Sequence, residues 1–341
     1  MSARRINVLV TGASGFLGGN ILQAISLEEG IRPVAACRDK TKLSGAYTGE
    51  VRQGDLRDPA YRRELVQDID IICHAGTWAA MWGHGQEEES NFYEPTLDLI
   101  EQAIKAGCKR FLMSSTVAIA KADKKGNGLD DFAQGTYTGF WPHLDRLVDI
   151  ECYMRAHVQR GMQMTSMRLG HFIGAGNRLG LVPALVPRLK SRLVPWLNGG
   201  KARMPLITDS DLAQGFIAAI KAEGLNDYES FNICGNDFPR AREVIDYIAA
   251  KTGLPKPLYS VPYPVAYVFA WLMESLFPIL PGKGPFLTRA IVHLAEDWYC
   301  PSTYAQQKLG FKAKKAWQAA MDEALEELSS EGYPWPFLAQ R

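Results

Sequence analysis

The sequence has almost no excess of charge of either sign. Its 38 lysines and arginines are matched by 37 aspartates and glutamates, which leaves a formal net charge of +1. Proteins that bind nucleic acid or anionic membranes through charge alone carry a clear basic excess. We therefore expect no nucleic-acid partner and no membrane contact of purely electrostatic origin.

Cysteine patterns typical of disulfide-rich or zinc-binding proteins are also missing. The six cysteines are scattered over 341 residues, and no two of them form a C-x-x-C pair. This spacing indicates neither a disulfide framework nor a zinc site, so we expect no metal. The apolar run before "TGASG" is too short for a signal peptide, and both observations favour a reducing, cytoplasmic setting.

The sequence has no apolar run long enough to cross a bilayer, which takes ~20 residues. The nearest approach is "YPVAYVFAWLMESLFPIL", residues 263–280, which Glu274 interrupts. We expect a core or lid helix here. The alternative is a helix over an apolar substrate mouth that touches a membrane surface, which would make the protein peripheral to a membrane.

What the sequence does contain is a regular alternation of strands and helices. Hydrophobic residues make up 47% of the chain and charged residues 22%, which is typical of a globular protein. Long helical patterns cover residues 20–30, 91–107 and 143–161. Six strands are predicted between them, at residues 6–10, 32–37, 51–56, 69–76, 110–115 and 163–170. This order predicts an α/β fold with a doubly wound parallel sheet.

The alternation breaks after about residue 174, where proline and glycine become frequent and helices then dominate. We expect residues 1–174 to form a dinucleotide-binding domain and residues 175–341 to form mainly a smaller, helical substrate lobe. The segment "ESFNICG" still has a strand pattern. Segments near 205–235 are therefore expected to return to the first domain.

A glycine-rich loop follows the first predicted strand and opens a helix. In "VTGASGFLGGN", the glycines at 12, 15 and 18 are spaced G-x-x-G-x-x-G. Gly12 permits the tight turn, Gly15 lets the backbone approach a pyrophosphate, and Gly18 lets the helix pack closely on the sheet. The helix N-terminus, at Phe16 and Leu17, then offers N–H groups to the phosphates. We predict a Rossmann-type dinucleotide site.

The end of the second predicted strand bears on the choice of cofactor. A carboxylate there would bind the adenosine ribose hydroxyls, whereas this chain has Arg38 in "AACRDKTK". A guanidinium can hold a ribose phosphate with two hydrogen bonds, and Ser14 could add a hydroxyl. Asp39 is the counter-argument, because a shift of one residue would bring it to the ribose. We favour NADP, with NAD as the alternative.

The order of these motifs resembles the extended short-chain dehydrogenase/reductase superfamily, of the NAD(P)-dependent epimerase/dehydratase type. The resemblance rests on "TGASGFLG", "GDLRD", "HAG", "NFYEPTLDLIEQAIKAGCKRFLMSST", "MRLGHFIGAGN", "PLITDSDLAQGFIAAI" and "ESFNICGND". The ending "LTRAIVHLAEDWYCPSTYAQQKLGF" looks most like the 3β-hydroxysteroid dehydrogenase branch. The resemblance implies that Asp55 and Leu56 lie beside the adenine, and that Ala75 and Gly76 lie along the cofactor.

The resemblance also implies an active site with a Ser or Thr, a Tyr, and a Lys four residues after the Tyr. Thr116 fits the first role, with Ser115 as its rival. The family's Tyr follows a Pro, and a Glu stands four residues beyond its Lys. Here Pro142 precedes His143, and Glu151 follows Leu147 by four residues. The Tyr position is therefore expected to hold His143, and the Lys position Leu147.

Three residues are candidates for the missing acid/base. The first is His143 itself, because an imidazole can act as an acid or base near neutrality without a Lys, although Arg146 could reach the ribose in part. Tyr137, in the loop "GTYTGFWP", could fold into the pocket, or it is a packed or surface residue. His171 could face the substrate, or it makes a loop hydrogen bond. A fourth hypothesis is a cofactor-binding sensor, scaffold or non-redox enzyme.

Aromatic and methionine residues are concentrated in predicted loops on the substrate side. They are Trp78, Met81, Trp82, Phe140, Trp141, Trp196 and Trp271. This concentration favours an apolar or planar ligand, a hydrophobic alcohol or ketone rather than a nucleotide sugar. The charged stretches "QEEES" and "KADKK" are interpreted as solvated loops. We expect an NAD(P)-dependent oxidoreductase, with a homodimer as an assembly that the sequence allows.

Overall fold

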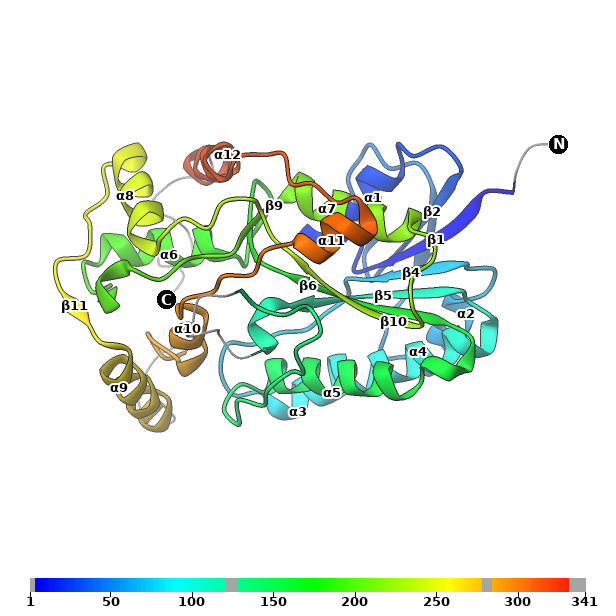
Figure 1. Ribbon diagram of the computed structural model, residues 1–341, viewed down its shortest axis with the longest axis horizontal. Coiled ribbons are helices and arrows are strands. Elements are labelled where there is room, and N and C mark those ends of the chain that lie inside the picture. The colour runs from blue at the N-terminus through cyan, green and yellow to red at the C-terminus, as the bar shows by residue number, and fades with distance from the viewer. Residues whose placement is uncertain (1–3, 121–127, 278–283, 331–341) are drawn as a thin grey trace.

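A seven-stranded parallel sheet forms the centre of the protein in a computed structural model, which describes residues 4–120, 128–277 and 284–330 (Figure 1). The strand order is β10-β6-β5-β4-β1-β2-β3, and every neighbouring pair is parallel. The strands are β1 (Ile6–Thr11), β2 (Ile31–Cys37), β3 (Glu50–Gln53), β4 (Ile71–His74), β5 (Arg110–Thr116), β6 (Gln163–Leu169) and β10 (Tyr228–Ile233). The predicted α/β fold with a parallel sheet is confirmed.

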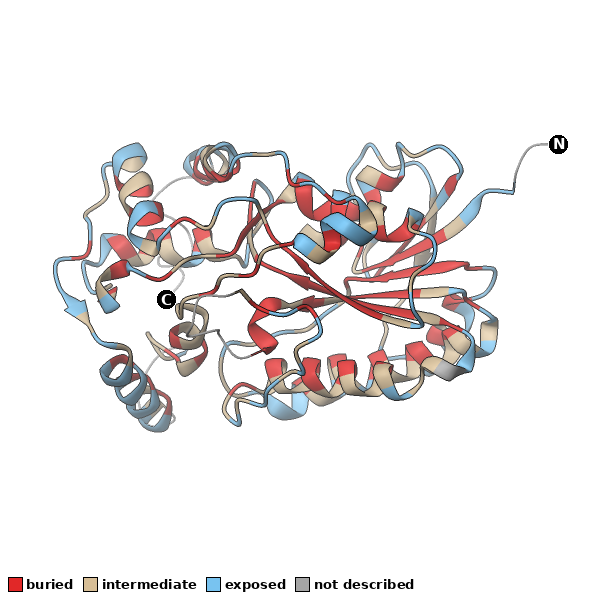
Figure 2. Ribbon diagram, in the orientation of Figure 1, coloured by how far each residue is buried: buried red, intermediate tan, exposed pale blue. Residues whose placement is uncertain are grey.

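Helices cover both faces of the sheet, as Figure 1 shows. One face carries α1 (Phe16–Ile25), α7 (Asp209–Lys221) and α11 (Thr303–Leu309), and the other carries α2 (Pro59–Leu65), α4 (Glu94–Ala106) and α5 (Pro142–Ala156). Alternate residues of a strand point to opposite faces. Val8 and Val10 of β1 accordingly join the core under α1 and α7, while Leu9 joins the core under α4 and α5. The central strands are mostly buried, as Figure 2 shows, whereas no residue of the edge strand β3 is buried.

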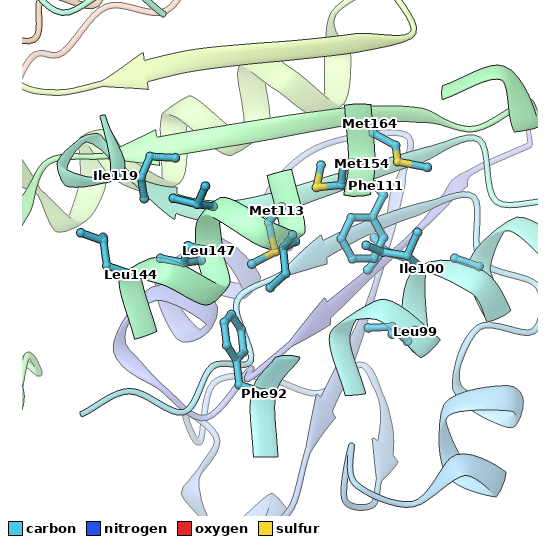
Figure 3. Close-up of a cluster of buried hydrophobic side chains, with 14 of the residues drawn as sticks. Phe92, Leu99, Ile100, Phe111, Met113, Ile119, Leu144, Leu147, Met154 and Met164 are labelled. Atoms are coloured by element: carbon cyan, nitrogen blue, oxygen red, sulfur yellow. The ribbon is translucent and has the colours of Figure 1, made fainter. Parts of the chain in front are cut away.

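The core between the sheet and the pair α4 and α5 fixes the position of α5. Figure 3 shows Leu144 and Leu147 of α5 in the same cluster as Met113 of β5 and Phe92. Leu144 and Phe92 are 0% and 2% exposed. Apolar side chains therefore pack around the first turn of α5 on both sides of His143. This packing fixes the position of the helix backbone at His143.

The rest of the chain forms a second, mainly helical part. Its larger helices are α6 (Leu181–Lys190), α8 (Ala241–Thr252), α9 (Tyr263–Leu276), α10 (Arg289–Leu294) and α12 (Trp317–Ser330). Small parallel strand pairs join β7 (His171–Ile173) to β9 (Leu206–Thr208) and β8 (Trp196–Leu197) to β11 (Ser260–Val261). Because β10 lies beside β6, the chain returns from this part to the central sheet.

Short helical turns connect the larger elements. They are η1 (Lys40–Lys42), α3 (Gly85–Glu88), the π-helical turn η2 (Glu89–Tyr93), η3 (Val117–Ile119), η4 (Val158–Arg160) and η5 (Asn198–Gly200). The turn α3 and the π-helical turn lead directly into α4, which packs beside α5. Their position matters for the candidate site, because the start of α5 faces them.

The helix α9 has an unusual distribution of side chains. Its buried residues are Ala266, Ala270 and Glu274, whereas Val265 and Phe269 are 57% and 50% exposed. It is therefore not a core helix, because most of its large apolar side chains are exposed. Residues 278–280 of the predicted segment lie outside the described residues. Within the described part of the chain, no helix has both the length and the hydropathy needed to span a bilayer.

Candidate active site

The glycine-rich loop between β1 and α1 is shaped by close backbone approaches. Gly12 has a φ of +62°, and a Cβ there would lie 2.7 Å from the Ala75 carbonyl oxygen. A Cβ at Gly18 would lie 2.2 Å from the Gly12 carbonyl oxygen. Gly15 begins the helix, and its N–H donates to Gly12 at 2.9 Å. The N–H groups of the first turn, at Phe16 and Leu17, have no intrahelical partner. This geometry fits a pyrophosphate.

A neutral histidine supports the cofactor side of β4. His74 joins Thr11 to Thr96, because its Nδ1 lies 2.8 Å from Thr11 Oγ1 and its Nε2 lies 3.0 Å from Thr96 Oγ1. Burial lowers the pKa of His74 to about 4, so the ring is uncharged at neutral pH. Thr11 Oγ1 also accepts the N–H of Gly76 at 3.0 Å. The predicted pair Ala75 and Gly76 is thus held against the glycine loop by groups that the sequence did not reveal.

The residues predicted at the adenosine end lie at the carboxyl ends of β2 and β3. The side chain and backbone N–H of Thr41 both donate to the Asp39 carboxylate and lower its pKa. Hydrogen bonds from Arg57 likewise lower the pKa of Asp55, at 2.7 Å between Nη2 and Oδ2. Arg38 and Ser14 are exposed, and Leu56 approaches Gly76. Asp39 is thus engaged in its own turn, whereas Arg38 follows the strand directly.

The register of α5 is set by a buried ion pair two turns along the helix from His143. Glu151 accepts from Arg168 Nη2 at 2.6 Å, and the two residues are 3% and 0% exposed. Glu151 also accepts from the Ser115 hydroxyl at 2.9 Å. The Ser115 hydroxyl is therefore committed to the interior. Thr116, the last residue of β5, accepts the N–H of Ala118 at 3.3 Å, and among the described residues its hydroxyl donates to no partner.

His143 stands in the first turn of α5 and meets a buried carboxylate. Its Nδ1 lies 2.6 Å from Oε1 of Glu88, and the two side chains are 14% and 1% exposed. The rings of Phe92 and Trp141 lie 5.4 Å and 6.5 Å from the imidazole. Leu147, one turn further, is 4% exposed in the core shown in Figure 3.

The interpretation of "QEEES" as a solvated loop is wrong for Glu88. Its neighbour Glu87 is solvated, with 52% of its side chain exposed, but Glu88 is turned inward to His143. The reason is that residue 88 ends a helical turn whose inner face packs on α5. The other stretch, "KADKK", lies outside the described residues.

Arg146 points away from the expected cofactor position. Its Nε lies 2.8 Å from Glu89 Oε2, its Nη1 lies 2.5 Å from Asp149 Oδ2, and its guanidinium lies over the ring of Tyr93. These contacts hold the cation on the outer surface of α5. The partial ribose contact considered for Arg146 therefore has no support in its placement.

The two other acid/base candidates differ in their surroundings. Tyr137 is 57% exposed and donates to Asp149 Oδ1 at 2.6 Å, which raises its pKa to about 12. Its position corresponds to the surface alternative. His171 lies in β7, and its enclosed Nε2 finds no hydrogen-bond partner among the described residues. Burial lowers the pKa of His171 to about 4, so the ring is neutral.

Four of the seven aromatic and methionine residues lie around the start of α5. Trp141 Nε1 donates to the Ala80 carbonyl at 2.8 Å, which ties the loop after β4, with Trp78 and Trp82, to the helix. The Trp82 ring lies 5.2 Å from Phe277, and Phe140 lies 5.7 Å from Tyr267 of α9. The remaining three lie elsewhere: Trp196 in the core of the second part, and Met81 and Trp271 on the surface.

A further histidine, which the sequence analysis did not identify, packs against the aromatic residues at the start of α5. His293 of α10 lies between Phe140 and Trp141, with ring centroids 6.4 Å and 6.3 Å away. Its Nε2 lies 2.9 Å from the carbonyl oxygen of Ala118, just beyond β5. This contact joins the helical part of the chain to the carboxyl end of the sheet, where Thr116 lies.

A comparison with protein families matches residues 8–234 to the family described as NAD dependent epimerase/dehydratase. The matched region covers more than half of the chain and includes the glycine loop, the strand with Thr116 and all of α5. The chain belongs to this family. The resemblance to the extended short-chain dehydrogenase/reductases is confirmed, and this epimerase/dehydratase family member is an oxidoreductase that uses a nicotinamide dinucleotide.

Relatives at low identity carry reductase and dehydrogenase names. A 2-alkyl-3-oxoalkanoate reductase of Stenotrophomonas maltophilia is 25% identical, over 95% of this chain and 99% of the relative. A decarboxylating sterol-4-alpha-carboxylate 3-dehydrogenase of Dictyostelium discoideum is 22% identical, over 93% and 99%. The solved UDP-glucuronic acid 4-epimerase of Bacillus cereus, in complex with its nucleotide sugar and NAD, is 15% identical, covers 96% and 100%, and has a TM-score of 0.74. That likeness shows a common fold.

Proposed function

We propose that this family member is an NADP-preferring oxidoreductase that acts on a hydroxyl or carbonyl group of a hydrophobic small molecule. His143 serves as its acid/base, and Thr116 holds the substrate oxygen. The observation that carries the proposal is the placement of His143. The Glu151–Arg168 pair fixes α5, and no described residue offers a hydrogen bond to His143 Nε2. An imidazole nitrogen in this position is free to exchange a proton with a substrate.

The proposed chemistry divides between the cofactor and the chain. A bound nicotinamide would supply or accept the hydride. The hydroxyl of Thr116 would donate a hydrogen bond to the substrate oxygen and so orient it. His143 Nε2 would give its proton to that oxygen during reduction, and would take it back during oxidation. An imidazole titrates near neutrality, so no cation is needed at position 147 to activate it.

The preference for an apolar substrate rests on the residues around His143. Trp78, Trp82 and Phe140 come from two loops; Phe277, directly after α9, packs on Trp82, and Tyr267 of α9 packs on Phe140. The relatives named above act on alkyl and sterol compounds according to their names. Both facts support a hydrophobic alcohol or ketone.

The preference for NADP rests on the contrast between Arg38 and Asp39. Both hydrogen bonds from Thr41 go to Oδ1 of Asp39, and they hold this carboxylate in its own turn. Arg38 is exposed, and within the described chain its guanidinium has no hydrogen bond of its own. A guanidinium in that state can bind a ribose phosphate without giving up another partner.

An activity screen tests the function. Oxidation of NADPH is followed with hydrophobic ketones and quinones, and in parallel the binding of NADPH is measured by calorimetry. We expect turnover with at least one apolar carbonyl compound. Silence across the screen together with intact NADPH binding would support the alternative, a cofactor-binding protein that has lost redox turnover.

We also propose that α9 rests on a membrane surface. Its one charged residue, Glu274, is turned inward, where its Oε2 accepts from Arg289 at 2.6 Å. The outward side chains of Val268, Phe269 and Leu272 are uncharged and 54%, 50% and 42% exposed. Co-sedimentation with neutral phospholipid vesicles tests this. Phe269→Glu should abolish binding, whereas Leu27→Glu, on a residue 84% exposed elsewhere, should leave it unchanged.

A further inference from the structure

We infer that Glu88 is the positioning residue of His143: its carboxylate fixes the tautomer and the orientation of the imidazole so that Nε2 faces the substrate. This inference rests on the proposed function of His143 and names the group on which that function depends. The Glu88 carboxylate does not itself touch the reacting atoms. It acts through Nδ1, on the far side of the ring.

The hydrogen-bond chemistry of the pair decides where the proton lies. An ionised carboxylate only accepts, so at 2.6 Å the hydrogen must be on Nδ1 of His143. In the neutral ring Nε2 is then unprotonated and can act as a base, and in the imidazolium it carries the proton needed for an acid. Phe92 and Trp141 lie against the ring and restrict its rotation.

The local backbone explains how Glu88 reaches this position. His84 has a φ of +60° and precedes the single turn α3, which ends at Glu88. The π-helical turn η2 follows and leads into α4. Residues four apart share a face of a helical segment, and both Glu88 and Phe92 are buried against α5. Interruptions by π-helical turns occur frequently at functional sites.

The charge of Glu88 suits an imidazole and would not suit the family's usual phenol. The resemblance implies a Tyr whose ionised form is favoured by a Lys. A base that becomes a cation when it takes a proton is instead favoured by a nearby anion. This chain has His143 for the Tyr, the uncharged Leu147 for the Lys, and the buried anion of Glu88 2.6 Å from the ring. The three residues are chemically consistent with one another.

The same helical turn offers a matched control. Glu87 pairs with His84, with 3.3 Å between Oε1 and Nδ1, but the two side chains are 52% and 51% exposed. An exposed pair of this kind is solvated and contributes little. A substitution at Glu87 therefore changes the charge of α3 by the same amount as one at Glu88, without affecting His143.

Glu88→Gln tests the inference, because it keeps the size of the side chain and removes its charge. We expect kcat to fall by roughly 10²-fold or more, as when a carboxylate that orients a histidine becomes an amide. KM and the Kd for NADPH should stay within about 3-fold, because binding does not use the carboxylate. Glu87→Gln should behave as the unsubstituted protein, and Glu88→Asp should recover part of kcat.

A readout independent of turnover separates this inference from the proposed function. The protein labelled with ¹⁵N at its six histidines is studied by NMR, and His143→Phe assigns the signal. We expect the Nδ1–H tautomer in the unsubstituted protein and a mixed population in Glu88→Gln. A neutral ring that carries its proton on Nε2, or full kcat in Glu88→Gln, would overturn the role of Glu88. A correct tautomer in a protein that reduces no carbonyl compound would instead overturn the proposed function.

Discussion

The two ends of the cofactor site are built from different materials. At the nucleotide end, backbone atoms of one short loop form the site for the pyrophosphate. Gly12 and Gly18 are required there because any side chain would collide with the main chain. At the reaction end, the proposed chemistry depends on side chains from three separated segments, namely Glu88, Thr116 and His143. A site formed by backbone atoms restricts which residues the loop can contain. A site formed by side chains allows its residues to be substituted, provided that the interacting residues change together.

The largest effect is expected from removing the proposed acid/base at the reaction end. His143→Phe keeps a planar ring between Phe92 and Trp141 and removes both nitrogens. Loss of a general acid/base costs on the order of 10²–10⁴ in kcat, and the pH dependence of turnover should disappear with it. Steady-state kinetics over a pH range measure both, and an unchanged Kd for NADPH would show that the nucleotide end is intact.

Unchanged turnover in His143→Phe would move the acid/base role to His171. His143→Tyr is the informative companion, because the new phenol would stand next to the Glu88 carboxylate, with the uncharged Leu147 at the position of the family's Lys. We expect it to be as inactive as His143→Phe. The double variant His143→Tyr with Leu147→Lys would restore the Tyr and Lys that the family uses. Its ammonium would enter a site that is 4% exposed among apolar side chains, so we expect a loss of stability and no rescue.

A smaller but still large effect is expected at the nucleotide end. Gly18→Ala would place a Cβ 2.2 Å from the carbonyl oxygen of Gly12, and neither backbone can move cheaply. We expect the affinity for NADPH to fall by roughly 10²-fold, about 2.8 kcal/mol, measured by calorimetry. Gly19→Ala is the control, because its Cβ would make an ordinary 3.5 Å contact with the Ala13 carbonyl. Equal losses in both variants would contradict the steric argument.

The choice between the two dinucleotides gives an intermediate effect. Arg38→Ala removes one charge-assisted contact to a ribose phosphate, which contributes ~1.5–3 kcal/mol. The Kd for NADPH should therefore rise by roughly 10–150-fold, while the Kd for NADH stays nearly constant. Calorimetry with both cofactors measures the ratio. The same loss for NADH and NADPH would show that Arg38 is a solvated surface residue.

The nucleotide end was largely predictable from the sequence, and the reaction end only in part. The six predicted strand segments and "ESFNICG" correspond to the seven strands of the sheet. The clearest of them is the continuous apolar run of β1, because a parallel strand buried on both faces needs hydrophobic residues throughout. The register of α5 followed from Pro142 and Glu151. The choice between Ser115 and Thr116 could not be predicted from the sequence. It depends on which of the two hydroxyls reaches Glu151 of α5, and that is the hydroxyl of Ser115.

Glu88 and Glu274 show why local composition misleads. Glu88 stands in a run of charged and polar residues, and the π-helical turn after it has no recognised sequence signature. Glu274 interrupts an apolar run, yet it is buried because Arg289, fifteen residues further on, pairs with it. In both cases a partner distant in sequence decides the burial of the carboxylate, and a window of neighbouring residues does not contain that partner.

The smallest effect is expected outside both ends of the site. Tyr137→Phe removes a hydroxyl that donates to Asp149 on the surface of α5. That hydrogen bond raises the pKa of Tyr137 to about 12, so the phenol stays protonated and cannot act as a base near neutrality. We expect kcat and KM to change by less than about 2-fold, and the free energy of unfolding to fall by ~0.5–1.5 kcal/mol for the lost hydrogen bond. Steady-state kinetics and urea denaturation measure the two quantities. A fall in kcat of about 10²-fold with normal stability would instead place Tyr137 at the reaction end during turnover. The surface of α5 near Tyr137 would then belong to the active site.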